Sequence, residues 1–131
     1  MNCHLLFVYG LLRKEASHEK STYLSEQATF IEHAIFQGKL FRIEAYPGVT
    51  PSDNKTDTVI GEVYELPNDN ILSNLDYFEG IGESFPRPYE YRRQICDVTL
   101  SSGSICQAWI YLYNRDLNEF EQISSGDFLN P

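Results

Sequence analysis

The sequence predicts an α+β fold: a small, mixed and strongly bent β-sheet that closes toward a barrel, with short helices on its flanks. The predicted elements follow the order strand, helix, strands, helix, hairpin. Residues 105–113 carry apolar side chains on both faces, which predicts a central strand covered on two sides. A chain of 131 residues suffices for one hydrophobic core, so we expect a single domain over residues 1–131.

The first part of the chain predicts a buried strand and then a polar helix. Residues 5–9 form an apolar run that ends at Gly10, which is typical of a strand followed by a turn. Glycine also lets the backbone approach a ligand closely. Residues 17–27 are polar apart from Tyr23 and Leu24, and we expect a short, partly exposed helix there.

The middle of the chain predicts strands separated by turns. Residues 28–43 are rich in β-forming side chains, and Gly38 divides them into two expected strand pieces around a bulge or bend. Residues 45–48 form a predicted turn, and residues 51–57 lack apolar anchors, as in a mobile surface loop. Residues 58–66 alternate between two faces and predict another strand.

A short amphipathic helix is predicted at residues 68–80. Asn68 or Asp69 can cap its first turn, and Gly80 is suited to the C′ position that ends a helix. At about 100° per residue, one stripe roughly 120° wide collects the large apolar side chains of this segment. Glu79 falls inside the same stripe. The apolar side chains of the stripe are Ile71, Leu72, Leu75 and Phe78.

The position of Glu79 predicts a carboxyl group with a raised pKa. Burial disfavours the charged form, and the C-terminal end of a helix carries partial negative charge, so both effects raise the pKa of Glu79. A general acid/base that works near neutral pH needs such a shift. The alternative is a glutamate of the last helical turn that bends out to solvent.

The last third of the chain predicts a long hairpin and a tail. Residues 89–100 and 105–113 are two strands, and the Ser-Ser-Gly-Ser segment at 101–104 is the turn between them. Residues 114–131 form a tail with a polar turn, in which Asp127 is expected to satisfy backbone N–H groups.

The composition argues against several classes of protein. A formal net charge of −9 argues against nucleic-acid binding and against a basic membrane-surface segment. The first residues lack the pattern of a signal peptide, and three cysteines without CxxC spacing are typical of reduced thiols, so we expect a cytoplasmic protein. The histidines lack metal-ligand spacing, so we expect no metal site and no cofactor. The cysteines are Cys3, Cys96 and Cys106, and the histidines are His4, His18 and His33.

Four segments together resemble one known family. They are FVYGLLR at 7–13, VIGEVY at 59–64, LDYFEG at 75–80 with YRR at 91–93 after it, and ISSGDF at 123–128. In this order and at these intervals they resemble the gamma-glutamylcyclotransferase-like family, above all its short bacterial and plant members. The resemblance spans nearly the whole chain. It implies a small mixed β-barrel with flanking helices and a pocket between the Tyr-Gly loop and the acid-bearing helix.

The resemblance also implies an activity and a set of site residues. The expected enzyme, an acyltransferase or lyase, would release an amine from a small γ-glutamyl amide and leave 5-oxoproline. Glu79 would be its catalytic acid/base. The family usually has Ser or Thr after the Tyr-Gly pair, whereas this chain has Leu11, which keeps the backbone N–H but removes a hydroxyl contact. The candidate substrate-binding residues are Tyr9, Gly10, Leu11, Leu12, Arg13 and Tyr113.

Several alternatives stay open at this level. The same fold could be a module that binds a small ligand without turnover, or an interaction protein that uses its aromatic strand surface. The arginines at 87, 92 and 93 could include a partner for the substrate's α-carboxylate, or could be a solvated strand edge. Tyr111 and Tyr113 could line a pocket or pack in the core. The leaving amine could belong to an amino acid, a peptide, a polyamine or a lysine side chain.

Overall fold

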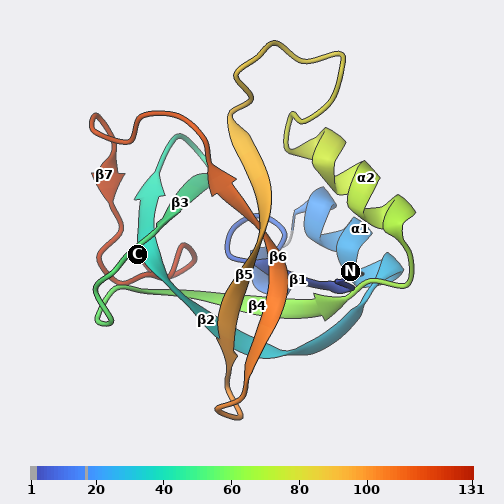
Figure 1. The fold of residues 1–131 in the computed structure, drawn as a ribbon, viewed down its shortest axis with the longest axis horizontal. Coiled ribbons are helices and arrows are strands. Elements are labelled where there is room, and N and C mark those ends of the chain that lie inside the picture. The colour runs from blue at the N-terminus through green and yellow to red at the C-terminus, as the bar shows by residue number, and fades with distance from the viewer. Residues whose placement is uncertain (1–2, 17) are drawn as a thin grey trace.

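The computed structural model describes residues 3–16 and 18–131. Figure 1 shows a curved sheet with two helices packed along one side of it. The elements in chain order are β1 (Leu5–Val8), η1 (Lys14–Ala16), α1 (Glu19–Gln27), β2 (Thr29–Arg42), β3 (Pro47–Pro51), β4 (Thr58–Glu65), α2 (Asp69–Phe78), β5 (Tyr91–Leu100), β6 (Ile105–Tyr113) and β7 (Glu121–Gln122).

The sheet is mixed and closes on itself, which confirms the predicted fold class. The strand order β2-β4-β1-β6-β5 returns to its start because β5 also pairs with β2, at Ala34↔Leu100. β1 runs antiparallel to β4 and parallel to β6, where Leu6 lies opposite Trp109. The first strand is therefore interior to the barrel sheet, and the loop that follows it starts from a rigid position.

The long strand β2 differs from its prediction. It is one strand of 14 residues, not two pieces around Gly38. The register shift lies between Phe30 and Glu32, and at Gly38 the strand changes its partner from β4 to β3. A Cβ on Gly38 would lie 2.6 Å from the carbonyl oxygen of Thr50, so the glycine permits the close approach of β3.

Two short strands were not predicted. Pro47 and Gly48 resemble a turn in sequence, yet they begin β3, and Gly48 pairs with Phe41 of β2. Farther along, β7 pairs with the same end of β2. Local turn propensity is overridden at Gly48 because its missing side chain lets the ring of Tyr113 pack against the backbone.

Two apolar clusters lie on the two faces of β1. Phe7 is fully buried in the cluster inside the barrel, whereas Leu6 and Val8 belong to the cluster beneath the helices. Three residues of the predicted α2 stripe are buried in that second cluster, namely Ile71, Leu72 and Leu75. The helix α2 is thus held against the outer face of β1, which places its C-terminal end beside the loop that follows β1. In the described part of the chain, no helix is long and apolar enough to cross a membrane.

Candidate active site

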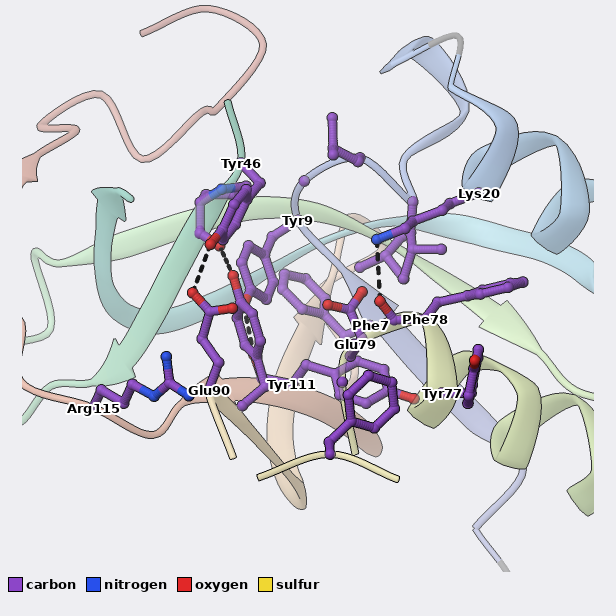
Figure 2. A pocket seen from close by; sticks show the side chains of 18 of the residues that line it. Phe7, Tyr9, Lys20, Tyr46, Tyr77, Phe78, Glu79, Glu90, Tyr111 and Arg115 are labelled. Carbon is purple, nitrogen blue, oxygen red and sulfur yellow. Dashed lines mark hydrogen bonds between the residues drawn. The ribbon is translucent and has the colours of Figure 1, made fainter. Parts of the chain in front are cut away.

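A cavity of about 390 Å³ lies where the end of β1, the C-terminal end of α2 and the loop before β5 meet. Its lining is largely aromatic and apolar, and its charged side chains are few (Figure 2). Five residues predicted from the sequence to form the site line it, namely Tyr9, Gly10, Leu11, Leu12 and Glu79. The fold therefore brings the Tyr-Gly loop and the acid together, although they are far apart in sequence.

A helix-ending motif places Glu79. Asn68 caps the start of α2 by accepting bonds from the N–H groups of Asn70 and Ile71. At the other end Gly80 adopts a φ of +75°, its N–H donates to the Tyr77 carbonyl, and the Ile81 N–H donates to the Asp76 carbonyl. This pair of bonds is the Schellman arrangement, which favours glycine at C′. Glu79 is thereby fixed as the C-cap residue.

An ion pair fixes the last turn of α2 on the sheet. Arg93 of β5 holds both carboxylate oxygens of Asp76, with Nε 2.7 Å from Oδ1 and Nη2 3.0 Å from Oδ2. The Tyr111 hydroxyl of β6 donates to the same Oδ1 at 2.8 Å. A bidentate arginine–carboxylate pair is both strong and directional. Of the arginines considered from the sequence, Arg93 therefore positions the helix that carries Glu79.

The carboxyl group of Glu79 has an unusual electrostatic environment. Burial raises its pKa from its ordinary value of 4.5 to about 7; the Lys20 ammonium acts against this shift, and the charges of Glu90 and Asp76 add to it. Among the described residues, none donates a hydrogen bond to the Glu79 side chain. A carboxyl with a pKa near neutrality and no protein donor is able to take up and return a proton.

Two tyrosines of the cavity, Tyr9 and Tyr91, use their hydroxyls as donors to backbone carbonyls. The Tyr9 hydroxyl donates to the Tyr111 carbonyl and the Tyr91 hydroxyl to the Pro47 carbonyl, each at 2.5 Å. Burial raises the pKa of both phenols well above its usual value. These phenols stay protonated and structural, which leaves Glu79 as the group in the cavity suited to proton transfer near neutral pH.

Three charged residues of the cavity were not found from the sequence, namely Lys20, Glu90 and Arg115, and the first two make the following contacts. Lys20 of α1 extends into it and donates from Nζ to the Phe78 carbonyl at 3.2 Å (Figure 2). Glu90 lies at another part of the lining and accepts from the Tyr46 hydroxyl at 2.6 Å. Neither residue has a motif around it, because each reaches the cavity only through the packing of distant segments.

Comparison with known proteins assigns the chain to a family. A family model described as "Gamma-glutamyl cyclotransferase, AIG2-like" matches residues 6–130. The chain belongs to this family. The Escherichia coli K12 protein YtfP, named as a gamma-glutamylcyclotransferase family protein, is 31% identical over 125 residues, which cover 95% of this chain and 96% of YtfP.

Solved structures give the same result for the fold of this gamma-glutamylcyclotransferase family member. Bacillus subtilis YkqA superimposes with a TM-score of 0.72 at 35% identity, and the match covers 98% of this chain but 40% of YkqA. E. coli YtfP gives 0.64 at 30% identity, with 96% of each chain covered. A mouse AIG2-like protein gives 0.72 at 22% identity over 92% of this chain and 83% of its own, a likeness in fold.

Two predicted site residues of this family member do not line the cavity. Arg13 is 5% exposed, and its guanidinium turns to the carboxylates of Asp127, at 2.7 Å, and Glu62, at 3.7 Å. Tyr113 is buried beside the cavity, packs on Tyr91 and donates to Glu90 at 3.3 Å. Tyr113 contacts lining residues from outside the cavity, and Arg13 binds carboxylates outside it. Neither side chain lies where a ligand in the cavity would contact it.

A cluster of possible metal ligands lies outside the cavity. The ligand atoms of Glu15, His33 and Glu62 lie within 4.8 Å of one another, a proximity that sequence spacing does not show. The guanidinium of Arg13 occupies the same cluster, with Nη2 3.9 Å from Glu15 and Nε 3.7 Å from Glu62. Its positive charge already pairs with the carboxylates and opposes a cation. That the family member needs no metal stays a prediction.

Gly10 offers a test of the Tyr-Gly loop. It is buried, and a Cβ on it would lie 2.7 Å from Cγ of Pro47, so Gly10→Ala must displace the loop or the proline. Misplacing a positioning group by about 1 Å can cost about 100-fold in rate. We therefore expect Gly10→Ala to lower kcat/KM on a γ-glutamyl amide by about 10- to 100-fold, measured beside a thermal melt.

Gly103→Ala is the matched control for Gly10→Ala. Gly103 lies in the β5–β6 hairpin turn, outside the cavity lining, with open space around a Cβ but a φ of +97°, so Gly103→Ala should lower the melting temperature and leave kcat/KM unchanged. A Gly10→Ala protein as active as wild type would mean that the loop is not part of the machinery.

Proposed function

We propose that this family member cleaves a γ-glutamyl amide by intramolecular cyclisation, with Glu79 as the general acid/base. The observation that carries the proposal is the carboxyl of Glu79, with a pKa near 7, in the same cavity as the backbone of the Tyr-Gly loop. The substrate supplies its own nucleophile, its α-amine. Folding into a five-membered ring brings this amine to the γ-carbonyl, which is catalysis by proximity.

The proposed reaction balances without an external reagent. The α-amine nitrogen attacks the γ-carbonyl carbon and forms the ring C–N bond, while Glu79 takes a proton from that nitrogen. The tetrahedral intermediate then collapses, the original amide C–N bond breaks, and Glu79 returns the proton to the leaving nitrogen. The products are 5-oxoproline and a free amine, and no group is oxidised or reduced.

The Tyr-Gly loop supplies donors for the developing oxyanion. Such donors are often the largest single contribution to acyl-transfer catalysis. The Gly10 carbonyl accepts from the Arg13 N–H at 3.0 Å, which closes a tight turn. Within the residues that the structure describes, the N–H groups of Leu11 and Leu12 have no acceptor. Both residues line the cavity, and their N–H groups support the assignment of the loop to the oxyanion.

A panel of γ-glutamyl amides tests the proposed function. The panel should include amino-acid, peptide, polyamine and ε-lysyl leaving groups, with 5-oxoproline release followed by chromatography. We expect release from at least one class, above the spontaneous rate. Binding of these compounds without release of 5-oxoproline would contradict the enzyme and favour a binding module of the same fold.

The pH dependence of kcat/KM is a separate prediction. Because Glu79 must be ionised to take the first proton, activity should rise with pH and level off above about 7 rather than above its ordinary pKa of 4.5. The substrate's own α-amine also titrates, so its pKa is measured separately by NMR. An acid limb centred near the ordinary pKa of a glutamate would contradict the raised pKa of Glu79.

A further inference from the structure

We propose that the ammonium of Lys20 binds the α-carboxylate of the substrate, so that Lys20 and Glu79 together receive the charged α-carbon head of a γ-glutamyl group. This inference rests on the proposed function and adds a specificity-determining residue to it. In the described part of the chain, two cationic side chains line the cavity, Lys20 and Arg115.

Lys20 is held in place but keeps donors free. Its Nζ is 3.2 Å from the carbonyl oxygen of Phe78, the residue directly before Glu79, so α1 is tied to the end of α2 at the site itself. An ammonium has three N–H donors, and this bond uses one. Within the described residues, no ion pair joins Lys20 to Glu79, although the two charges influence each other. The remaining donors of Lys20 are available to a ligand.

The arrangement of these two charges matches the chemistry of the substrate. In a γ-glutamyl group the α-amine and the α-carboxylate are attached to the same carbon, so the protein groups that meet them must be neighbours. Figure 2 shows the Lys20 ammonium and the Glu79 carboxylate directed into the same part of the cavity. A carboxylate on Lys20 would leave the amine beside Glu79, where the proposed mechanism needs it.

The other cation of the lining is less suited to this role. Arg115 donates from Nη2 to the Pro88 carbonyl at 3.2 Å, and Figure 2 places it beside Glu90, away from Glu79. The carboxylate of Glu90 would repel a second carboxylate at that end. Each end therefore combines one cation with one carboxylate, but only the Lys20 end holds Glu79, which must meet the amine on the same carbon as the substrate's carboxylate.

The experiment compares two cyclic products, and two amide substrates, that differ only by the α-carboxylate. Binding of 5-oxoproline and of 2-pyrrolidinone, which lacks the carboxylate, is measured by calorimetry or NMR for wild type, Lys20→Met, Lys20→Arg and Lys39→Met. Lys39 is an exposed residue of β2 outside the cavity lining and serves as the matched control. The kinetic counterpart is the ratio of kcat/KM for a γ-glutamyl amide to that for the 4-aminobutanamide of the same leaving amine, which lacks only the α-carboxylate.

We expect wild type and Lys39→Met to bind 5-oxoproline about 10- to 100-fold more tightly than 2-pyrrolidinone, because a charge-assisted hydrogen bond is lost with the carboxylate. Lys20→Met should bring this preference, and the kinetic ratio, close to one, and Lys20→Arg should restore part of both. A Lys20→Met protein that keeps the wild-type preference, or a wild type that has none, would overturn the inference.

The outcomes separate this inference from the proposed function. If 5-oxoproline binds through Lys20 but no γ-glutamyl amide is turned over, the proposed function fails and the assignment of Lys20 stands. If turnover is observed and Lys20→Met keeps the preference for the carboxylate, the proposed function stands and the assignment of Lys20 is wrong.

Discussion

Glu79→Gln should leave the fold intact and lower the rate of 5-oxoproline release by about 10⁴-fold or more. General acid/base catalysis typically contributes about 10²- to 10⁴-fold, and one residue that serves both proton transfers should reach the upper end of that range. Glutamine has nearly the volume of glutamate but cannot exchange a proton at accessible pH. The measurement is the rate on the best substrate of the panel. A variant with more than about a tenth of the wild-type rate would contradict the role of Glu79.

The stability of the same variant gives an independent check of the site. Folding raises the pKa of Glu79 from 4.5 to about 7. Between these two pH values the folded protein therefore keeps the proton on Glu79, whereas the unfolded protein loses it. The free energy of unfolding of wild type therefore falls as pH rises through this window. Glu79→Gln lacks this loss, so it should be more stable than wild type by about 1 to 3 kcal/mol near pH 8, and equal to it near pH 4.

Denaturant melts of both proteins at the two pH values measure this difference. Glu83→Gln, on the loop after α2, is the control, because Glu83 is exposed and does not line the cavity. Equal stability of wild type and Glu79→Gln near pH 8 would mean that folding does not raise the pKa of the carboxyl.

The acid-bearing helix could be predicted because its signals are local. Asn68 is the cap and Gly80 is the C′ residue, as expected from the sequence. Three apolar residues of the predicted stripe are buried, whereas Phe78 at its end is 37% exposed. Sequence periodicity placed Glu79 on that stripe, but the Schellman bonds and the Asp76–Arg93 ion pair decide that it stays in the cavity. The ion pair joins residues 17 positions apart, on a helix and a strand, and no local pattern shows it.

The rest of the site depends on tertiary packing. Lys20 belongs to a polar helix with a weak amphipathic pattern, and only its packing against α2 brings the ammonium to the cavity. Glu90 and Tyr46 meet from loops 44 residues apart in sequence. The strands β3 and β7 could not be predicted from the sequence either, because they form by pairing with the end of β2 and their own residues favour turns. Side chains that meet through tertiary packing need the fold before they can be assigned.

Arg13 shows the opposite case, a residue of the family-like motif whose position indicates a structural role. Its buried guanidinium is the cation shared by Glu62, which is 0% exposed, and Asp127. Burial and the neighbouring Glu15 raise the pKa of Glu62. Burial also acts to raise the pKa of Asp127, but the hydrogen bonds from Arg13 and Asn130 outweigh it and lower that pKa below its usual value. The cluster ties the turn after β1 to β4 and to the C-terminal segment.

Arg13→Met should therefore act on stability rather than on substrate binding. Removing one partner from a buried charge cluster leaves the other charges uncompensated, which typically costs about 3 to 5 kcal/mol. We expect a loss of this size in urea melts near pH 7, and a smaller loss at low pH, because Asp127 with its lowered pKa then becomes protonated. The KM of the folded fraction on a γ-glutamyl amide should stay within about twofold of wild type, since the side chain does not line the cavity.

A double-mutant cycle with Glu62→Gln separates charge pairing from packing in this cluster. If Arg13 stabilises the fold by neutralising Glu62, the Arg13→Met/Glu62→Gln protein should lose less stability than the sum of the single variants, by about 0.5 to 3 kcal/mol. Additive losses would assign the effect to packing alone. A stable Arg13→Met protein with a strongly raised KM would instead mean that Arg13 binds substrate, as the family resemblance in the sequence implies. The turn after β1 would then have to rearrange on binding.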